Sequence, residues 1–221
     1  MEIAELEREY VTNTYNAIAR KFSDTRYNVW PSVSKFINSV DITSKLFEAG
    51  CGNGKNMLIR PTQFTGIDSS DELVKICVDR GLNVQVGDIC DCPFEDKSFD
   101  HSICIAVLHH LSTPIRRLAA LKELRRVTKH SVLIEVWSYE HYQFRPKDKV
   151  CSELIGLNSF TTIEPNPQDR MIEFNSNDKT KNHRYYHFFT KEEICELIKL
   201  ALFEIDEIYE EAGNWIIVTK S

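Results

Sequence analysis

The 221-residue sequence lacks any apolar run near the roughly 20 residues that a membrane-spanning helix requires. It also lacks a surplus of basic residues, because 27 Lys and Arg stand against 33 Asp and Glu, for a net charge of −6. Affinity for nucleic acid comes mostly from phosphate neutralisation, so strong unaided binding is not expected. Residues 1–5 are acidic and lack the profile of a signal peptide. We therefore expect no membrane segment and a cytoplasmic or nuclear location.

A disulfide or zinc framework is also missing. The seven cysteines are odd in number and scattered along the chain, which indicates reduced thiols. Cys90 and Cys92 form a pair that is too tight for ordinary zinc spacing and that has no second pair. We interpret both as structural and expect no metal site.

Glycine is scarce, with eight residues in all, and three of them crowd one bend. A short apolar run ends in Glu48, and Gly50, Gly52 and Gly54 follow at alternate positions. Glycine permits a sharp bend and the close approach of a ligand, where a Cβ would clash. The pattern predicts a strand that runs into a turn holding a nucleoside-bearing ligand. It resembles the first motif of class I S-adenosylmethionine-dependent methyltransferases.

Other glycine turns fit less well. In a dinucleotide-binding turn, Gly-x-Gly-x-x-Gly, Lys55 would occupy the third glycine position. A Walker loop needs Ser or Thr after its lysine, and Lys55 is followed by neither. A dinucleotide site and a glycine-rich turn without a ligand stay open as alternatives.

Apolar runs alternate with helical patterns, which predicts a mostly parallel sheet with right-handed crossovers. Gly213-Asn214 is a turn signal between two further strands and predicts a terminal hairpin. The expected fold class is a Rossmann-like α/β domain with helices on both faces and a C-terminal antiparallel hairpin. We expect strands at 46–49, 64–67, 83–86, 99–105, 131–137, 203–209 and 215–219, and helices at 2–20, from Pro31, and at 54–60, 70–80 and 114–128.

One domain over residues 1–221 is the natural size for such a fold. We expect residues 1–40 to form a helical extension on the substrate side. Residues 138–189 are polar and break the alternation, so we interpret them as a partly flexible insertion before the last helix. That helix should open at the capping box of residues 190–193.

Acidic residues follow the next two strands, at the sheet edge where α/β proteins bind ligands. Asp68, twenty residues after Glu48, can accept hydrogen bonds from ribose hydroxyls. Asp88 can take the adenine amino hydrogen while Ile89 covers the ring; a surface or turn carboxylate is the alternative for both acids. Glu48 can hold the turn or the ligand's amino group, and Ala106 would lie near the methionine portion. The predicted cofactor-binding set is Glu48, Gly50, Gly52, Gly54, Asp68, Asp88, Ile89 and Ala106.

Three further segments carry a more specific resemblance. Together they resemble the eukaryotic tRNA wobble-uridine carboxymethyl methyltransferases, over most of the chain but less in 140–180. That family converts 5-carboxymethyluridine at the tRNA wobble position into its methyl ester, with a small zinc-binding activator protein. The resemblance implies S-adenosylmethionine as cofactor, S-adenosylhomocysteine as product, a tRNA anticodon loop as substrate and a heterodimer. The segments are Arg26-Tyr27…Trp30-Pro31, Ala106-Val107-x-His109-His110 and Arg184-Tyr185-Tyr186-His187.

A carboxylate acceptor is ionised at neutral pH, so it needs no base but does need a cation to orient it. Arg26 and Arg184 are candidate clamps, because a guanidinium presents a planar donor fork. His109 is the candidate for positioning the reacting groups. The alternatives are surface ion pairs for the arginines and core packing for the rings. Candidate substrate-binding residues, which can stack or contact an anticodon base, are Tyr27, Trp30, His110 and Tyr186.

The strand expected at 83–86 should lie at a sheet edge, and it carries neither charge nor proline. Unpaired edges invite pairing with another chain, so we expect the activator to add a strand there. Basic residues gather at 116–129 and acidic ones at 204–211, which could let one face meet a polyanion. Two rival functions stay open: a methyltransferase for small carboxylates or metabolites, and a non-catalytic cofactor-binding scaffold.

Overall fold

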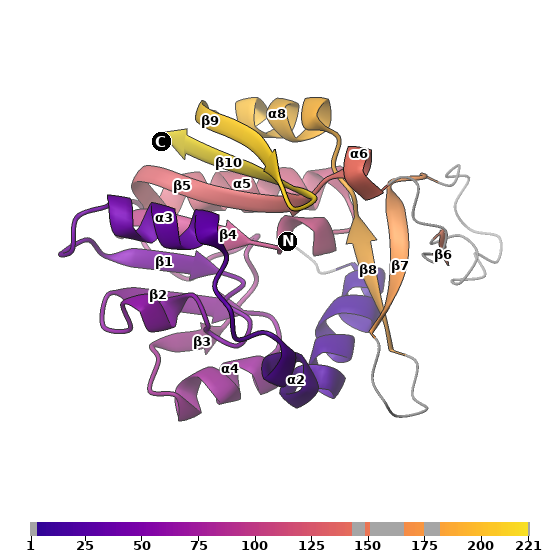
Figure 1. Cartoon of the computed structure of the whole chain (residues 1–221), viewed down its shortest axis with the longest axis horizontal. Helices are drawn as coiled ribbons and strands as arrows, with labels where there is room; N and C mark the ends of the chain where they lie inside the picture. The colour runs from indigo at the N-terminus through magenta and orange to yellow at the C-terminus, as the bar shows by residue number, and fades with distance from the viewer. Residues whose placement is uncertain (1–3, 143–148, 151–165, 175–181, 221) are drawn as a thin grey trace.

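The computed structural model describes residues 4–142, 149–150, 166–174 and 182–220. Its main sheet has the strand order β3-β2-β1-β4-β5-β10-β9 (Figure 1). Neighbours from β3 to β5 are parallel, and β10 runs antiparallel to both β5 and β9. The predicted fold class is therefore confirmed. The strands are β1 (Leu46–Ala49), β2 (Phe64–Asp68), β3 (Val84–Val86), β4 (Phe99–Ile105), β5 (Thr128–Trp137), β9 (Glu204–Glu211) and β10 (Asn214–Lys220).

Capping side chains fix where several helices begin. Ser70, Thr113 and Thr190 each accept a hydrogen bond from the backbone N–H three residues later, as expected of N-caps. Pro31 begins the third helix, where its missing N–H costs nothing. The helices are α1 (Glu5–Glu7), η1 (Arg8–Asn13), α2 (Thr14–Thr25), α3 (Pro31–Ser39), η2 (Met57–Ile59), α4 (Asp71–Asp79), η3 (Leu108–His110), α5 (Pro114–Val127), α6 (Tyr139–Tyr142) and α8 (Lys191–Leu200).

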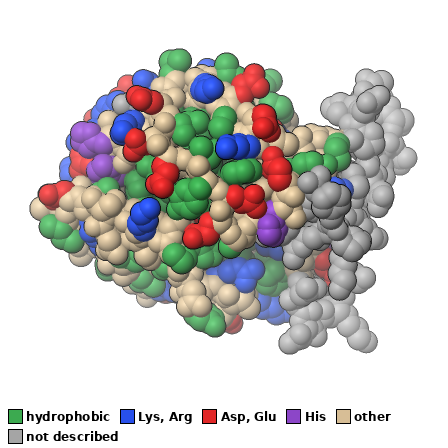
Figure 2. All heavy atoms as spheres, turned by 45° about the horizontal axis from the view of Figure 1, so that its top comes forward, with side chains coloured by type: hydrophobic (Ala, Val, Ile, Leu, Met, Phe, Trp, Pro, Cys, Tyr) green, Lys and Arg blue, Asp and Glu red, His purple; other side chains and the backbone are tan. Residues whose placement is uncertain are grey.

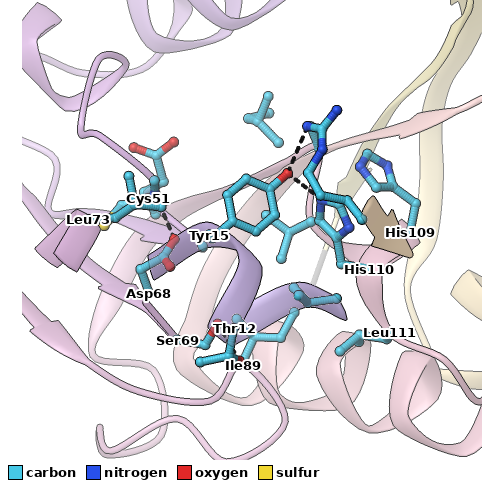
Figure 3. A pocket seen from close by; sticks show the side chains of 18 of the residues that line it. Thr12, Tyr15, Cys51, Asp68, Ser69, Leu73, Ile89, His109, His110 and Leu111 are labelled. Atoms are coloured by element: carbon cyan, nitrogen blue, oxygen red, sulfur yellow. Dashed lines mark hydrogen bonds between the residues drawn. The ribbon is translucent and has the colours of Figure 1, made fainter. Parts of the chain in front are cut away.

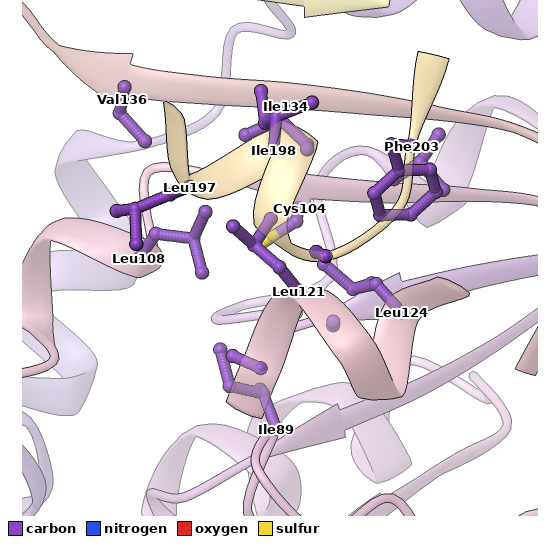
Figure 4. Close-up of a cluster of buried hydrophobic side chains, with 14 of the residues drawn as sticks. Ile89, Cys104, Leu108, Leu121, Leu124, Ile134, Val136, Leu197, Ile198 and Phe203 are labelled. Atoms are coloured by element: carbon purple, nitrogen blue, oxygen red, sulfur yellow. The ribbon is translucent and has the colours of Figure 1, made fainter. Parts of the chain in front are cut away.

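Helices cover both faces of the main sheet. Side chains of α3 and α4 pack on one face, against Ile103 and Leu133, among others. Side chains of α5 and α8 pack on the other face, against Cys104 and Ile134 (Figure 4). Successive strand residues point to opposite faces, so residues 102–105 of β4 and 132–136 of β5 are buried on both sides of the sheet. This core holds the carboxyl ends of the parallel strands in place.

Three predicted elements differ from the structure. The helix expected at 54–60 shrinks to the single turn η2, because Gly54 has a φ of +74° and the residues around it are held in the bend. The N-terminal helix extends to Thr25 and contains the π-helical segment η1. The hairpin turn falls on Ala212 and Gly213, both with positive φ, and Asn214 already begins β10.

The region between β5 and α8 contains a second sheet, which the sequence did not indicate. It consists of β6 (Lys149–Val150), β7 (Asp169–Phe174) and β8 (Asn182–His187), all antiparallel. Residues 143–148, 151–165 and 175–181 of the expected insertion lie outside the described residues. β8 packs against α2 and η3, on the side toward which the parallel strands point (Figure 1).

Several basic side chains of α5 form ion pairs with acidic residues elsewhere in the chain. Arg116 and Arg117 are buried and pair with carboxylates, Glu7 and Asp88 for the first and Glu193 for the second. These two residues are therefore not available to a polyanion, because long-range partners bury them. Acidic and basic side chains are interspersed over the face with α8, β9 and β10 brought forward (Figure 2).

Two further observations concern the rest of the described chain. Within it, no helix is both long enough and apolar enough to cross a bilayer, and no group of three metal-ligating side chains comes together. The thiols of Cys90 and Cys92 donate to the backbone oxygens of Arg116 and Ile89. β3 lies at the edge of the main sheet, as expected, and its Val86 is 55% exposed.

Candidate active site

The glycine bend lies between β1 and η2 and is tied to the end of β2. The backbone N–H groups of Gly50 and Cys51 both donate to the Ile67 oxygen at 2.8 Å. Gly50 has a φ of +76°, and a Cβ there would lie 2.4 Å from a Val107 methyl. At Gly54, also in the left-handed region, a Cβ would meet Leu82 at 2.3 Å. The bend therefore needs glycine for close packing as well as for its backbone conformation.

Asp68 organises this bend from the end of β2. Its Oδ2 accepts from the Gly52 N–H at 2.8 Å, and its Oδ1 accepts from the Ser70 N–H at 2.9 Å. Burial raises the pKa of the Asp68 carboxyl against these stabilising hydrogen bonds. The carboxyl lines the cavity above the sheet, where its remaining acceptor capacity is available to a ligand.

Glu48 lies beneath the same bend and is 1% exposed. Its Oε1 accepts from the Asn56 side chain at 2.7 Å, while its Oε2 has no partner. Burial raises the pKa of this carboxyl to about 8. A buried oxygen without a partner is costly, and because Glu48 lines the cavity, a donor on a ligand can satisfy it.

Asp88 lies on the adjacent wall and is held by a buried arginine. Arg116 Nη2 donates to both Asp88 oxygens at 3.1 and 2.8 Å, and Arg116 Nε donates to Glu7 at 2.8 Å. These contacts fix the Asp88 carboxylate and tie the N-terminal helix across the cavity. Ile89 is buried beside it, and Ala106 enters the left-handed region with a φ of +60°.

One cavity joins most of the predicted residues. Two of them stay outside its lining: Gly54, which packs beneath the bend, and Tyr27, which is 74% exposed. Figure 3 shows the side chains that surround the cavity. The predicted residues that line it are Glu48, Gly50, Gly52, Asp68, Asp88, Ile89 and Ala106 on the side of the glycine bend, and Arg26, Trp30, His109, His110, Arg184 and Tyr186 on the side of α2 and β8.

His110 is fixed by two hydrogen bonds. Its Nδ1 lies 2.8 Å from the Tyr185 oxygen, which can only accept, so Nδ1 carries the proton. Its Nε2 then accepts from the Tyr15 hydroxyl at 2.9 Å (Figure 3). Burial lowers the pKa of His110 to about 3, so the ring is neutral. Both nitrogens are thus occupied within the protein, and the ring holds Tyr15 and β8 in place.

His109 presents a neutral aromatic face. It is 1% exposed and stacks on Tyr186, with ring centroids 4.8 Å apart and planes at 23°. Burial holds the pKa of His109 well below its usual value, and its Nδ1 has no partner. Trp137 closes the same side, 5.7 Å from the His109 ring. These rings form an aromatic wall of the cavity.

Arg184 is a buried cation without a carboxylate. It is 6% exposed, its Nη1 donates to the Tyr15 hydroxyl at 3.4 Å, and its Nε has no partner. The rings of Tyr15, Phe174 and Tyr186 lie 5.2 to 5.8 Å from the guanidinium. Among residues 4–142, 149–150, 166–174 and 182–220 no acid pairs with it. Because a buried charge is unfavourable unless paired, this position suits an anionic ligand.

Arg26 and Trp30 lie at the exposed end of the cavity. The Arg26 side chain is turned back on α2, where Nη1 donates to the oxygens of Thr25 at 3.2 and 3.1 Å. Lys55 Nζ lies 5.1 Å from the centre of the Trp30 ring. The two cations make this mouth positive.

Sequence reasoning missed several lining residues. Tyr15 joins His110 and Arg184, and Asn56 holds Glu48. Glu7 reaches Arg116 across 109 positions. No local sequence pattern predicts such long-range pairs. The one available signal was the aromatic side chain of Tyr15 within the apolar stripe of a helix, which could have identified Tyr15 as a candidate.

Comparisons with known proteins agree with this geometry. Residues 47–134 match the family described as methyltransferase domain. A methyltransferase solved in complex with the Trm112 methyltransferase activator of Haloferax volcanii superposes with a TM-score of 0.65 at 14% identity, covering 98% of this chain and 97% of that one. The parallel sheet with its glycine bend and acidic strand ends defines a class I S-adenosylmethionine-dependent methyltransferase.

Sequence relatives narrow the class. The chain is 36% identical to the tRNA (carboxymethyluridine(34)-5-O)-methyltransferase of Schizosaccharomyces pombe, over all of this chain and 99% of that protein. It is 47% identical over 139 residues to the Arabidopsis thaliana protein of the same name, of which it spans 34%. The chain belongs to the tRNA (carboxymethyluridine(34)-5-O)-methyltransferase family.

Proposed function

We propose that this protein transfers a methyl group from S-adenosylmethionine to the carboxylate of 5-carboxymethyluridine at the tRNA wobble position and so forms the methyl ester. The observation that carries the proposal is Arg184. Its guanidinium is buried, lacks an acid within the described chain, and faces the cavity that also contains the glycine bend. An ionised carboxylate would supply the missing partner.

The residues on the opposite wall fit the cofactor. The unpartnered Oε2 of Glu48 suits the amino group of its methionine portion, and Asp68 and Asp88 offer acceptors for ribose and adenine. The cradle at Gly50 and Gly52 has no Cβ to obstruct it. When bound, S-adenosylmethionine supplies a methyl group already activated by the sulfonium.

The chain's own residues then have to orient and enclose the acceptor. Arg184, with the Tyr15 hydroxyl beside it, would hold the carboxylate in line for attack. His109, Tyr186 and Trp137 would exclude water from the reacting atoms. The low pKa values of His109 and His110 are compatible with this reaction, because an ionised carboxylate has no proton to lose.

The test is mass spectrometry of wobble nucleosides after tRNA that lacks the ester is incubated with protein and cofactor. We expect the carboxymethyluridine signal to fall as its methyl ester appears. Methyl incorporation into small carboxylates alone would favour the metabolite methyltransferase. Cofactor binding without transfer to any acceptor would favour the second rival function, a non-catalytic cofactor-binding scaffold.

The edge strand β3 suggests where an activator binds. β3 pairs with β2 alone among the described strands, and Gln85 and Val86 are exposed. A partner could therefore add a strand and cover apolar surface there, and the Haloferax methyltransferase was solved with such an activator. We expect Val86→Lys to abolish co-purification with a small zinc-binding activator. The matched control is Glu207→Lys on the opposite edge strand, β9, and loss of the complex in both variants would argue against this site.

A further inference from the structure

A partly buried ionic cluster lies on the side of β8 that faces away from the cavity. At its centre His187 is 1% exposed, with Nδ1 2.7 Å from Asp169 Oδ1 and Nε2 2.9 Å from Glu193 Oε1. Arg117 and Gln168 donate to Glu193 at 3.0 and 2.6 Å. The reaction described above uses none of these groups.

The cluster joins the small sheet to the methyltransferase core. His187 belongs to β8 and Asp169 to β7, whereas Glu193 lies in the first turn of α8 and Arg117 lies on α5. A doubly protonated imidazole donates to both carboxylates at once, so one side chain links the two halves. The Tyr185 hydroxyl adds a further hydrogen bond to Asp169 at 2.7 Å.

Strand geometry connects this cluster to the cavity. Side chains alternate between the two faces of a strand, so Tyr185 and His187 enter the cluster while Arg184 and Tyr186 line the cavity. Any shift of β8 against α8 therefore moves the guanidinium that faces the acceptor.

We propose that His187 is a positioning residue, whose imidazolium, held between Asp169 and Glu193, sets the place of Arg184 and Tyr186 over the acceptor. The inference rests on the proposed function, because it assigns Arg184 to the acceptor carboxylate. His187 touches neither reactant in this account and acts through β8. A displacement of about 1 Å at a reacting group can cost as much as 100-fold in rate.

The variant His187→Gln tests the proposal, since the amide nitrogen of glutamine can face one carboxylate while its oxygen, which only accepts, would face the other. We expect transfer to tRNA to fall by at least about tenfold, with cofactor affinity unchanged. His101→Gln is the matched control, because His101 is hydrogen-bonded to Ser131 and does not line the cavity. It should leave transfer unchanged. Tyr185→Phe, a milder change in the same cluster, should give a smaller loss of the same kind if His187→Gln fails to fold.

A second background separates positioning from general destabilisation. In the Arg184→Lys variant the planar donor fork is already lost. Adding His187→Gln to that variant should therefore lower the rate of methyl transfer by a much smaller factor than it does in the wild type. Equal costs in both backgrounds, or loss of cofactor affinity in His187→Gln, would overturn the proposal.

A nitrogen NMR measurement of the His187 ring is independent of the substrate. We expect a hydrogen on each ring nitrogen in the intact protein, because Nδ1 and Nε2 each face a carboxylate oxygen, and a ring with one hydrogen would overturn the proposal. A different outcome is a wild type that transfers no methyl to tRNA although both ring nitrogens carry hydrogens. In that case the proposed function would fail, while the link that His187 makes between β8 and α8 would stand.

Discussion

The two walls of the cavity differ in chemistry. The wall on the side of the glycine bend presents the carboxyl groups of Glu48, Asp68 and Asp88, together with backbone that approaches closely. The wall formed by α2, η3 and β8 presents the aromatic rings of Tyr15 and Tyr186 around a cation. An acidic wall suits a ligand with a positive charge, and a cationic wall suits an anion. Under the proposed function, this asymmetry would orient the cofactor and the acceptor toward each other.

The walls also differ in how they are held. The acidic wall combines backbone contacts, such as those of Gly52 and Ser70 with Asp68, with the Arg116 side chain that holds Asp88. The cationic wall depends on long-range side-chain contacts, such as His110 with Tyr15, 95 positions apart. A single substitution can thus disable one wall and leave the other intact, which makes the comparison testable.

The largest expected effect is on the cationic wall. Arg184→Ala should lower transfer to tRNA by at least about thirtyfold, since losing one partner of a buried charge pair costs about 2–5 kcal/mol. Cofactor affinity should be unchanged, and thermal stability unchanged or higher, because the removed charge has no acid within the described chain. Arg184→Lys keeps the positive charge but loses the planar donor fork, so its rate of transfer should lie between those of the wild type and Arg184→Ala. Isothermal calorimetry measures cofactor affinity, and single-turnover assays measure methyl transfer. A parallel loss of cofactor binding would break the separation of the walls.

Next in size is a paired test of the acidic wall. Gly50→Ala and Gly81→Ala both place a side chain at positive φ, +76° and +74°, at a strain of about 1–2 kcal/mol each. Only at Gly50 does the new Cβ clash, with Val107, whereas nothing lies within 4 Å at Gly81. We expect Gly50→Ala to abolish cofactor binding and to cost about 1–3 kcal/mol more in unfolding free energy. Equal effects in denaturation and calorimetry would show that the close approach is unimportant.

The same contrast explains what the sequence could predict. The mostly parallel sheet, the terminal hairpin and the acidic residues Glu48 in β1, Asp68 at the end of β2 and Asp88 after β3 were predicted from local patterns and spacing. Arg184 and Tyr186 could be proposed only from a family resemblance, because no periodicity relates them to Tyr15. The sheet of β7 and β8 was missed, since its strands carry many polar residues and its partners lie far along the chain. The expected helix at 54–60 failed because side-chain contacts and Gly54 hold that stretch in the bend.

A pH effect should distinguish Glu48 from its neutral replacement. Burial raises its pKa from 4.5 to about 8, so above pH 4.5 the unfolded state binds fewer protons than the folded one. Stability from this group is therefore fully present below about pH 4.5 and is lost as pH rises through about 8. The slope is at most about 1.4 kcal/mol per pH unit. We expect the unfolding free energy of the cofactor-free wild type to decline with pH relative to Glu48→Gln between pH 5 and 8 in urea titrations. If the unfolding free energies of the wild type and Glu48→Gln changed with pH in parallel, Glu48 would be ionised in the folded protein and the prediction would be wrong.

The smallest effect is expected at Tyr27, which marks where the cationic wall ends. Its side chain is 74% exposed and does not line the cavity, so Tyr27→Ala should change transfer by less than the about 1 kcal/mol that a stacked base would lose. Trp30→Ala, on a ring that does line the cavity, serves as the matched comparison and should cost more. Kinetics with full-length tRNA measure both. A loss at Tyr27 of about 1–3 kcal/mol would show that an anticodon base stacks there, and the substrate surface would then extend beyond the cavity onto the loop between α2 and α3.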